Sequence, residues 1–168
     1  PVIDIWSVIR WAHLLAAIAW IGGMLFILIV LLPVMRRSVP STERTLLVAQ
    51  VGERYGVLSW VALSILVVTG VLNGERRSVA WFHLLDGEYG RTLALKLLLV
   101  AIVIPITLVH AFYYGRRIPR LAEQAKEYGD DPALAAERRR LQRMSGILSA
   151  VNLLLNLAIV LLAAALVA

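Results

Sequence analysis

The chain of 168 residues contains no cysteine and only three methionines. Cysteine thiolates hold iron–sulfur clusters and attach c-type haem covalently, and paired cysteines form disulfides. All of these are therefore excluded within this chain, and soft ligands for Cu(I) are scarce. Any metal chemistry has to use His, Lys, Met, Asn or carboxylate side chains.

Charged residues are also scarce, at 17% of the chain, whereas hydrophobic residues make up 60% and the mean hydropathy is +0.79. This composition excludes a soluble globular domain. Four uncharged stretches, 11–35, 55–74, 97–115 and 144–168, are long enough to cross a bilayer. The first is longer than the apolar part of a signal peptide and lacks an A-x-A exit, so we expect a true span.

The sequence thus predicts an all-α integral membrane protein, an up-down bundle of four helices in a single transmembrane domain over residues 1–168. The flanking residues extend the spans to about 5–35, 55–74, 91–115 and 144–168. We expect both loops on the cytoplasmic side to be helical extensions. One should be capped by Ser41, and the other should start at Asp131 and Pro132.

Basic residues are distributed unevenly between the loops. The first and third loops carry twelve Lys and Arg residues, against four on the side of the termini (Arg10, Arg76, Arg77 and Arg91). Because cytoplasmic loops are enriched in Lys and Arg, both termini are predicted on the periplasmic side of a bacterial inner membrane. The excess of 17 basic over 11 acidic residues is explained in this way, and we expect no nucleic-acid partner.

Polar residues within the spans recur at alternating spacings of four and three, which is typical of a seam facing the centre of a left-handed bundle. Ser, Thr and Asn on such a seam are expected to form interhelical hydrogen bonds. The predicted seam consists of Trp6, Arg10, His13, Ala17, Trp20 and Met24; Tyr55, Ser59, Ala62, Leu66, Thr69 and Asn73; Lys96, Leu99, Val103, Ile106 and His110; and Ser145, Ser149, Asn152 and Asn156.

Two nitrogen donors, His13 and Lys96, are expected at a similar depth in parallel spans, one or two turns from the side of the termini. Imidazole is the commonest biological metal ligand, and haem iron takes a proximal His. A lysine amine binds iron only when neutral, which a low-dielectric site favours. Alternatively, Lys96 snorkels to the interface, or His83 of the second loop replaces it as the second ligand.

The residues around His13 have the chemistry of a porphyrin pocket. Gly22 and Gly23 remove side-chain bulk, Trp20 lies one heptad away and can stack, and Arg10 can pair with propionates. The competing interpretation is helix packing, since Ala19 and Gly23 stand at small-xxx-small spacing.

His110 follows Lys96 by 14 residues, about 21 Å along a helix, so it cannot easily share one iron with His13. It either hydrogen-bonds Asn152 or Ser149, or serves a second haem or a proton relay.

Two stretches carry a resemblance to known families. "HLLAAIAWIGGMLFILIVLLP" (13–33) resembles the first helix of the copper-resistance protein D family, with a His, small residues, a Trp, a glycine pair and a closing Pro. "YGRTLALKLLLVAIVIPITLVHAFYYGRR" (89–117) resembles that family's Tyr-Gly-Arg-x-Leu-x-x-Lys helix. Both are also similar to the HemJ-type protoporphyrinogen oxidases, with a His in helix 1 and a Leu-x-x-Lys-Leu motif in helix 3.

The resemblance implies a four-helix membrane fold in which His13 and Lys96 are associated with haem b. Our leading hypothesis is a membrane b-type haem protein with one haem or two, which transfers electrons or oxidises a quinol, a porphyrinogen or an oxygen species. The sequence leaves open whether this role is enzymatic.

Two other hypotheses remain. One is a copper-handling transporter with His13, Met24 and His110 as stations, and the other is a structural or assembly subunit. The oligomeric state is also open, and the face carrying Gly70 and Gly74 is the one that could serve a homodimer.

Overall fold

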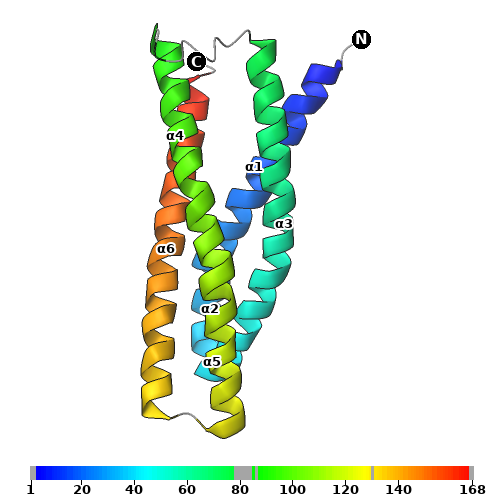
Figure 1. Ribbon diagram of the computed structural model, residues 1–168. Coiled ribbons are helices and arrows are strands. Elements are labelled where there is room, and N and C mark those ends of the chain that lie inside the picture. Colours follow the sequence, from blue (N-terminus) through cyan, green and yellow to red (C-terminus); the bar gives the residue numbers. More distant parts are fainter. Residues whose placement is uncertain (1–2, 78–84, 86, 130, 167–168) are drawn as a thin grey trace.

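The computed structural model describes residues 3–77, 85, 87–129 and 131–166, and these ranges contain helices and no strand (Figure 1). The four long helices are apolar enough to cross a membrane, which confirms the predicted all-α membrane bundle. The first span comprises α1 (Ile5–Leu25), the π-helical η1 (Phe26–Leu31) and α2 (Leu32–Ser38), and the second span is α3 (Ser41–Arg76). The third span comprises α4 (Gly87–Val109), the π-helical η3 (His110–Tyr114) and α5 (Gly115–Tyr128). The fourth span is α6 (Pro132–Ala165).

The segments beyond the predicted spans are helical, as expected. The helix α3 starts 14 residues before position 55, and α6 starts 12 residues before position 144. The N-cap of α6 is Asp131, with Pro132 in the first turn, as predicted. The prediction that Ser41 caps α3 is wrong by one residue, because Pro40 is the N-cap and Ser41 already belongs to the helix.

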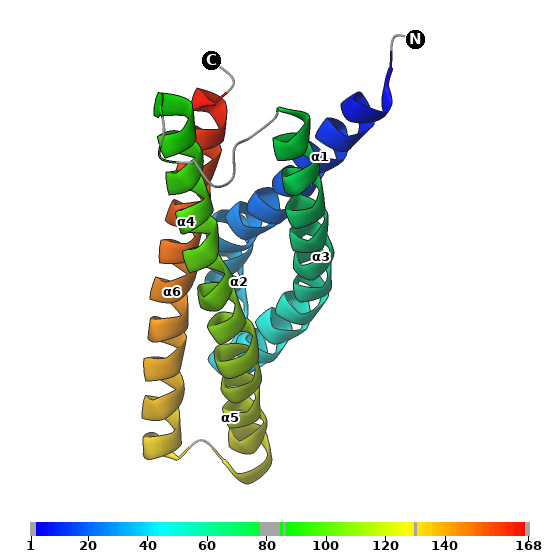
Figure 2. The same ribbon diagram turned by 45° about the horizontal axis from the view of Figure 1, so that its top comes forward.

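The helices pack as two pairs. The helix α1 packs mainly on α3, and α4 packs mainly on α6, while contacts of α5 with α3 and α6 join the pairs. Both termini lie at one end of the bundle, which we call the terminal end, and the pairs stand farther apart there than at the opposite, loop end (Figures 1 and 2).

The core lies where the pairs meet, and it is small. It is formed by Ala16, Trp20 and Met24 of α1 with Ala62 of α3 and Val103 of α4. Four of these five residues belong to the predicted seam, while large apolar residues on the other helix faces are exposed, as lipid contact requires. The seam prediction is wrong at Arg10, whose side chain is exposed.

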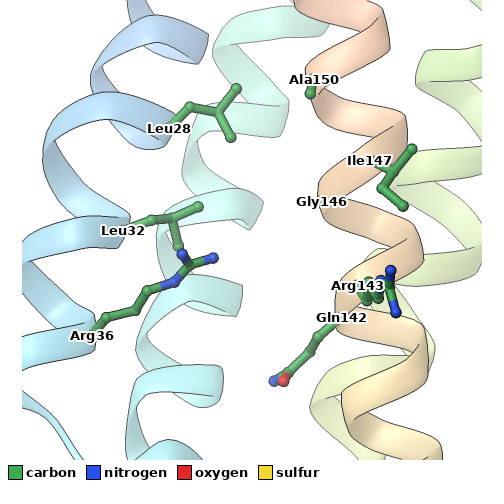
Figure 3. A pocket seen from close by; sticks show the side chains of 8 residues that line it. All are labelled: Leu28, Leu32, Arg36, Gln142, Arg143, Gly146, Ile147 and Ala150. Carbon is green, nitrogen blue, oxygen red and sulfur yellow. The ribbon is translucent and has the colours of Figure 1, made fainter.

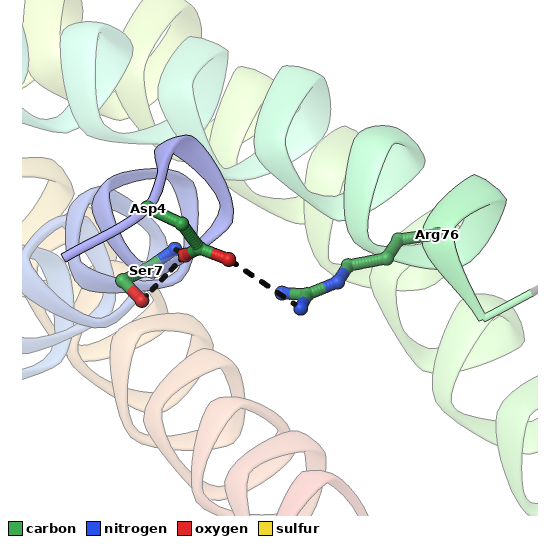
Figure 4. A network of polar contacts seen from close by, with 3 residues as sticks. All are labelled: Asp4, Ser7 and Arg76. Carbon is green, nitrogen blue, oxygen red and sulfur yellow. Dashed lines mark hydrogen bonds and ion pairs between the residues drawn. The ribbon is translucent and has the colours of Figure 1, made fainter. Parts of the chain in front are cut away.

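Polar contacts join the first turn of α1 to the last turn of α3 (Figure 4). Asp4 Oδ1 accepts hydrogen bonds from the Ser7 hydroxyl (2.6 Å) and backbone N–H (2.7 Å), and Oδ2 lies 3.8 Å from the Arg76 guanidinium. The Ser7 hydrogen bonds, helped by the charge of Arg76, hold the pKa of the Asp4 carboxyl below its ordinary value. Because both side chains are exposed, the ion pair orients the helix end more than it stabilises it.

The closest approach of α1 and α3 occurs at Gly23. A Cβ atom at this position would overlap the Tyr55 ring, whereas a Cβ at Gly22 would meet nothing within 4 Å. The Tyr55 hydroxyl donates a hydrogen bond to the Trp20 carbonyl oxygen, so the ring cannot move away freely. The absence of a side chain at Gly23 therefore serves helix packing.

This contact predicts opposite effects for two neighbouring glycines. Gly23→Ala should lower the free energy of unfolding by about 1–3 kcal/mol, because it overpacks the Tyr55 contact. Gly22→Ala should raise it by up to about 1 kcal/mol, because alanine is the better helix former. Reversible unfolding in mixed micelles measures both variants, and equal stabilities would contradict the Gly23–Tyr55 contact.

Candidate functional site

The imidazole of His13 lies between α1 and α3 near the terminal end. Its Nδ1 is 2.7 Å from the Thr69 hydroxyl oxygen, and the ring edge lies against Gly70, where a Cβ would stand 3.6 Å from Cε1. Thr69 is buried, and its hydroxyl donates a hydrogen bond of 2.5 Å to the Ile65 carbonyl oxygen. The side of α3 that carries Gly70 thus faces α1 within the chain and is not free to serve a homodimer.

The proton positions at His13 follow from this chain of hydrogen bonds. The Thr69 hydroxyl has one hydrogen, which it donates to Ile65, so towards His13 it can only accept. The proton of a neutral imidazole is consequently on Nδ1, and Nε2 carries a lone pair. No hydrogen bond to Nε2 forms within the described ranges, so this nitrogen is available to a ligand.

Lys96 joins this site from the other helix pair. It lies half-buried on α4, and its ammonium group is close enough to act electrostatically on the His13 ring. Arg77, at the end of α3, acts on Lys96 in the same way and also donates a hydrogen bond of 3.1 Å to the Leu166 carbonyl oxygen after α6. The charge of Lys96 on α4 thus acts on the His13 ring, which lies between α1 and α3.

The other members of the predicted porphyrin pocket are placed differently. Trp20 is 3% exposed because Ala16, Met24, Ala62 and Val103 surround it in the core. Tyr55 covers Gly23, and Arg10 is exposed at the terminal end. Protein side chains therefore fill the space at Trp20 and Gly23.

His110, in η3, is engaged with α6. Its Nε2 is 2.8 Å from the Ser149 hydroxyl and 3.1 Å from the Ser145 hydroxyl. The hydrogen-bonded interpretation is confirmed for Ser149 but wrong for Asn152, which donates to the Thr107 hydroxyl at 3.3 Å instead. Nε2 of His110 is therefore already engaged in hydrogen bonding with two serine hydroxyl groups of α6.

The remaining predicted ligands do not assemble into a larger metal centre. His83 lies outside the described residues. Among those that are described, no three or more His, Cys, Asp or Glu side chains gather to hold a metal ion. Met24, a proposed copper station, is buried in the core. A pair of axial nitrogen ligands to haem needs no such group.

The helical spacing predicted Thr69 and Tyr55 on the seam but not the residues that they contact. Neither the Thr69–His13 hydrogen bond nor the Tyr55–Gly23 contact has a local signal, since their partners lie 56 and 32 residues away along the chain. The hydrogen bond of 2.7 Å from the Gln142 amide to the Thr45 hydroxyl, between α6 and α3, was missed for the same reason.

The fold and these polar seams define the class, a multi-pass membrane protein built as a four-helix bundle. Residues 15–127 match the family described as "Domain of unknown function (DUF4149)", and the chain belongs to this family. The matched region contains Thr69 and Lys96 and starts two residues after His13.

The chain is also similar to an "Uncharacterized protein" of Aquifex aeolicus (strain VF5). The two are 28% identical over 106 residues, which cover 62% of this chain and 67% of the relative. No solved structure matches the chain significantly. The resemblance to the copper-resistance D and HemJ-type families stays a prediction.

The assigned proton positions predict a specific NMR result. In the neutral ring of His13, ¹⁵N signals should show a protonated Nδ1 and an unprotonated Nε2. Thr69→Val, which removes the acceptor but keeps the side-chain shape, should let the Nε2-protonated form appear. Thr107→Val is the matched control on another helix and should leave the His13 signals unchanged. A wild-type ring protonated on Nε2 would contradict the assignment.

Proposed function

We propose that this protein is a membrane b-type haem-binding protein with a redox role and that His13 is an axial ligand of the iron. The observation that carries the proposal is the hydrogen bond from His13 Nδ1 to Thr69. Histidines that bind metals almost always donate their other ring N–H to an oxygen acceptor, which fixes the tautomer and orients the ring. His13 meets this requirement through a hydroxyl group that is itself held by the Ile65 carbonyl.

Lys96 is the proposed second ligand. It is half-buried on α4 of the opposite helix pair, and its amine can bind iron only in the neutral form. The Cε1 edge of the imidazole lies against Gly70, and the core around Trp20 lies on the side of the site towards the loop end. Arg10, exposed three residues before His13, is the proposed partner of the propionates.

The bound haem would supply a one-electron centre that accepts and donates electrons. One haem is proposed, because His110 is already engaged with Ser145 and Ser149. Electron partners that suit this depth are lipid-soluble molecules, a quinol or a porphyrinogen. With twelve basic residues in the first and third loops against four on the side of the termini, the proposed site faces the periplasm across a bacterial inner membrane.

The absorption spectrum of the detergent-purified protein tests the proposal. We expect a Soret band that His13→Ala abolishes, because the iron loses its main protein ligand. His110→Ala is the matched control and should keep the band. Stoichiometric copper without a Soret band would favour copper handling instead, and a full band in His13→Ala would remove His13 from the site.

A second variant tests the lysine ligand. Lys96→Ala should convert a six-coordinate low-spin haem into a high-spin form, because His13 alone remains. Acidification of the wild type should have the same effect, since a protonated amine cannot bind iron. The readouts are the visible spectrum and electron paramagnetic resonance. A low-spin spectrum that persists in Lys96→Ala but is lost in His83→Ala would transfer the role to His83.

A further inference from the structure

A groove runs between the first span and α6 towards the loop end of the bundle (Figure 3). Its volume is about 360 Å³, within the usual range for small-molecule sites. It is lined by Leu28 of η1, Leu32 and Arg36 of α2, and Gln142, Arg143, Gly146, Ile147 and Ala150 of α6. None of these residues belongs to the His13 site.

The groove changes from apolar to basic along its length. On the first span, Leu28, Leu32 and Arg36 follow one another at intervals of four residues, so they form one row along a helix. The helix α6 runs in the opposite direction, and its Ala150, Ile147 and Arg143 therefore follow the same order. The walls are apolar towards the middle of the bundle, and both arginines lie towards the loop end.

Among the residues that the structure describes, neither arginine of the groove has an acidic partner. In the described part of the chain, neither Arg36 nor Arg143 forms an ion pair with a carboxylate, although they approach the groove from facing helices (Figure 3). Planar guanidinium groups bind phosphate oxygens through paired hydrogen bonds. The missing counter-charge therefore fits a phosphate group.

The middle of the groove is open beside Gly146. A Cβ atom at this position would meet nothing within 4 Å, so the space beside α6 is free. Protein contacts close the seam only in part, because α2 packs on α3, and α6 meets the first span mainly through α1. An occupant would thus join two helices that contact each other little here.

We propose that an anionic phospholipid occupies this groove. Its phosphate is held between Arg36 and Arg143, and an acyl chain lies against Leu28, Leu32 and Ile147. The order of apolar and basic residues matches the order of chain and headgroup in a bilayer leaflet, and basic pockets between membrane helices select anionic headgroups. The lipid stabilises the bundle by linking the first span to α6.

The test uses the full chain, purified in detergent and stripped of lipid. Phosphatidylglycerol and phosphatidylcholine with identical acyl chains are added at equal concentrations, and native mass spectrometry counts the bound lipid. We expect at least about a tenfold preference for phosphatidylglycerol and a higher unfolding midpoint with this lipid. Equal binding of the two lipids would overturn the proposal.

Two pairs of variants locate the lipid. Arg36→Gln with Arg143→Gln should reduce the preference at least about fivefold. The control, Arg37→Gln with Arg140→Gln, makes the same charge change on the same helices outside the groove and should keep the preference. Gly146→Leu should exclude the acyl chain by filling the groove, whereas Gly52→Leu, also in open space, should not. Unchanged binding in both groove variants would overturn the location.

Other occupants give different results. Inorganic phosphate or glycerol 3-phosphate that raises the unfolding midpoint as much as phosphatidylglycerol would show a plain anion site and overturn the lipid assignment. If Gly146→Leu turned a dimer into a monomer without loss of lipid, the groove would hold a second copy of this chain instead. Circular dichroism shows whether each variant has folded, and the arginine and glycine variants test the groove independently.

Discussion

Inside a bilayer no water is available to satisfy a polar group, and this constraint organises the whole bundle. The backbone meets it by forming helices. The polar side chains meet it by bonding to one another or to carbonyl oxygens. His13 of α1 bonds Thr69 of α3, Asn152 of α6 donates to Thr107 of α4, and His110 is held by two serines of α6. The polar seam thus fixes how the helices face each other, because turning one helix would leave such groups unpaired in an apolar medium.

The two histidines in the spans meet this constraint in different ways. His110 places Nε2 between two hydroxyl groups of α6, and this pairing links the third span to the fourth. Among the described residues, His13 bonds through Nδ1 alone and keeps a lone pair on Nε2. The His13–Thr69 hydrogen bond joins α1 to α3 but leaves Nε2 without a hydrogen-bond partner among the described residues. The lone pair on Nε2 is the group that the proposed ligand would use.

The two ends of the bundle have different chemistry as a result of how the pairs meet. At the terminal end the pairs diverge (Figure 2), and His13 lies there between α1 and α3. At the loop end α5 joins the pairs, and arginines gather at the ends of the helices. The proposed haem therefore lies in the less tightly packed half. The proposed lipid completes the other half, where α2 and α6 contact each other little.

Hydropathy and helical periodicity, read from the sequence alone, determined the membrane class, the four spans and most of the buried seam. Trp20, Met24, Ala62, Val103 and Asn156 are buried where the spacing predicted, because which face of a helix is apolar depends only on its own residues. Tertiary structure alone decided which seam residues meet. Tyr55 packs on Gly23, Thr69 bonds His13, and Asn152 bonds Thr107 rather than His110. Such pairings depend on the rotation and axial shift of one helix against another, and these follow from the packing of all side chains together.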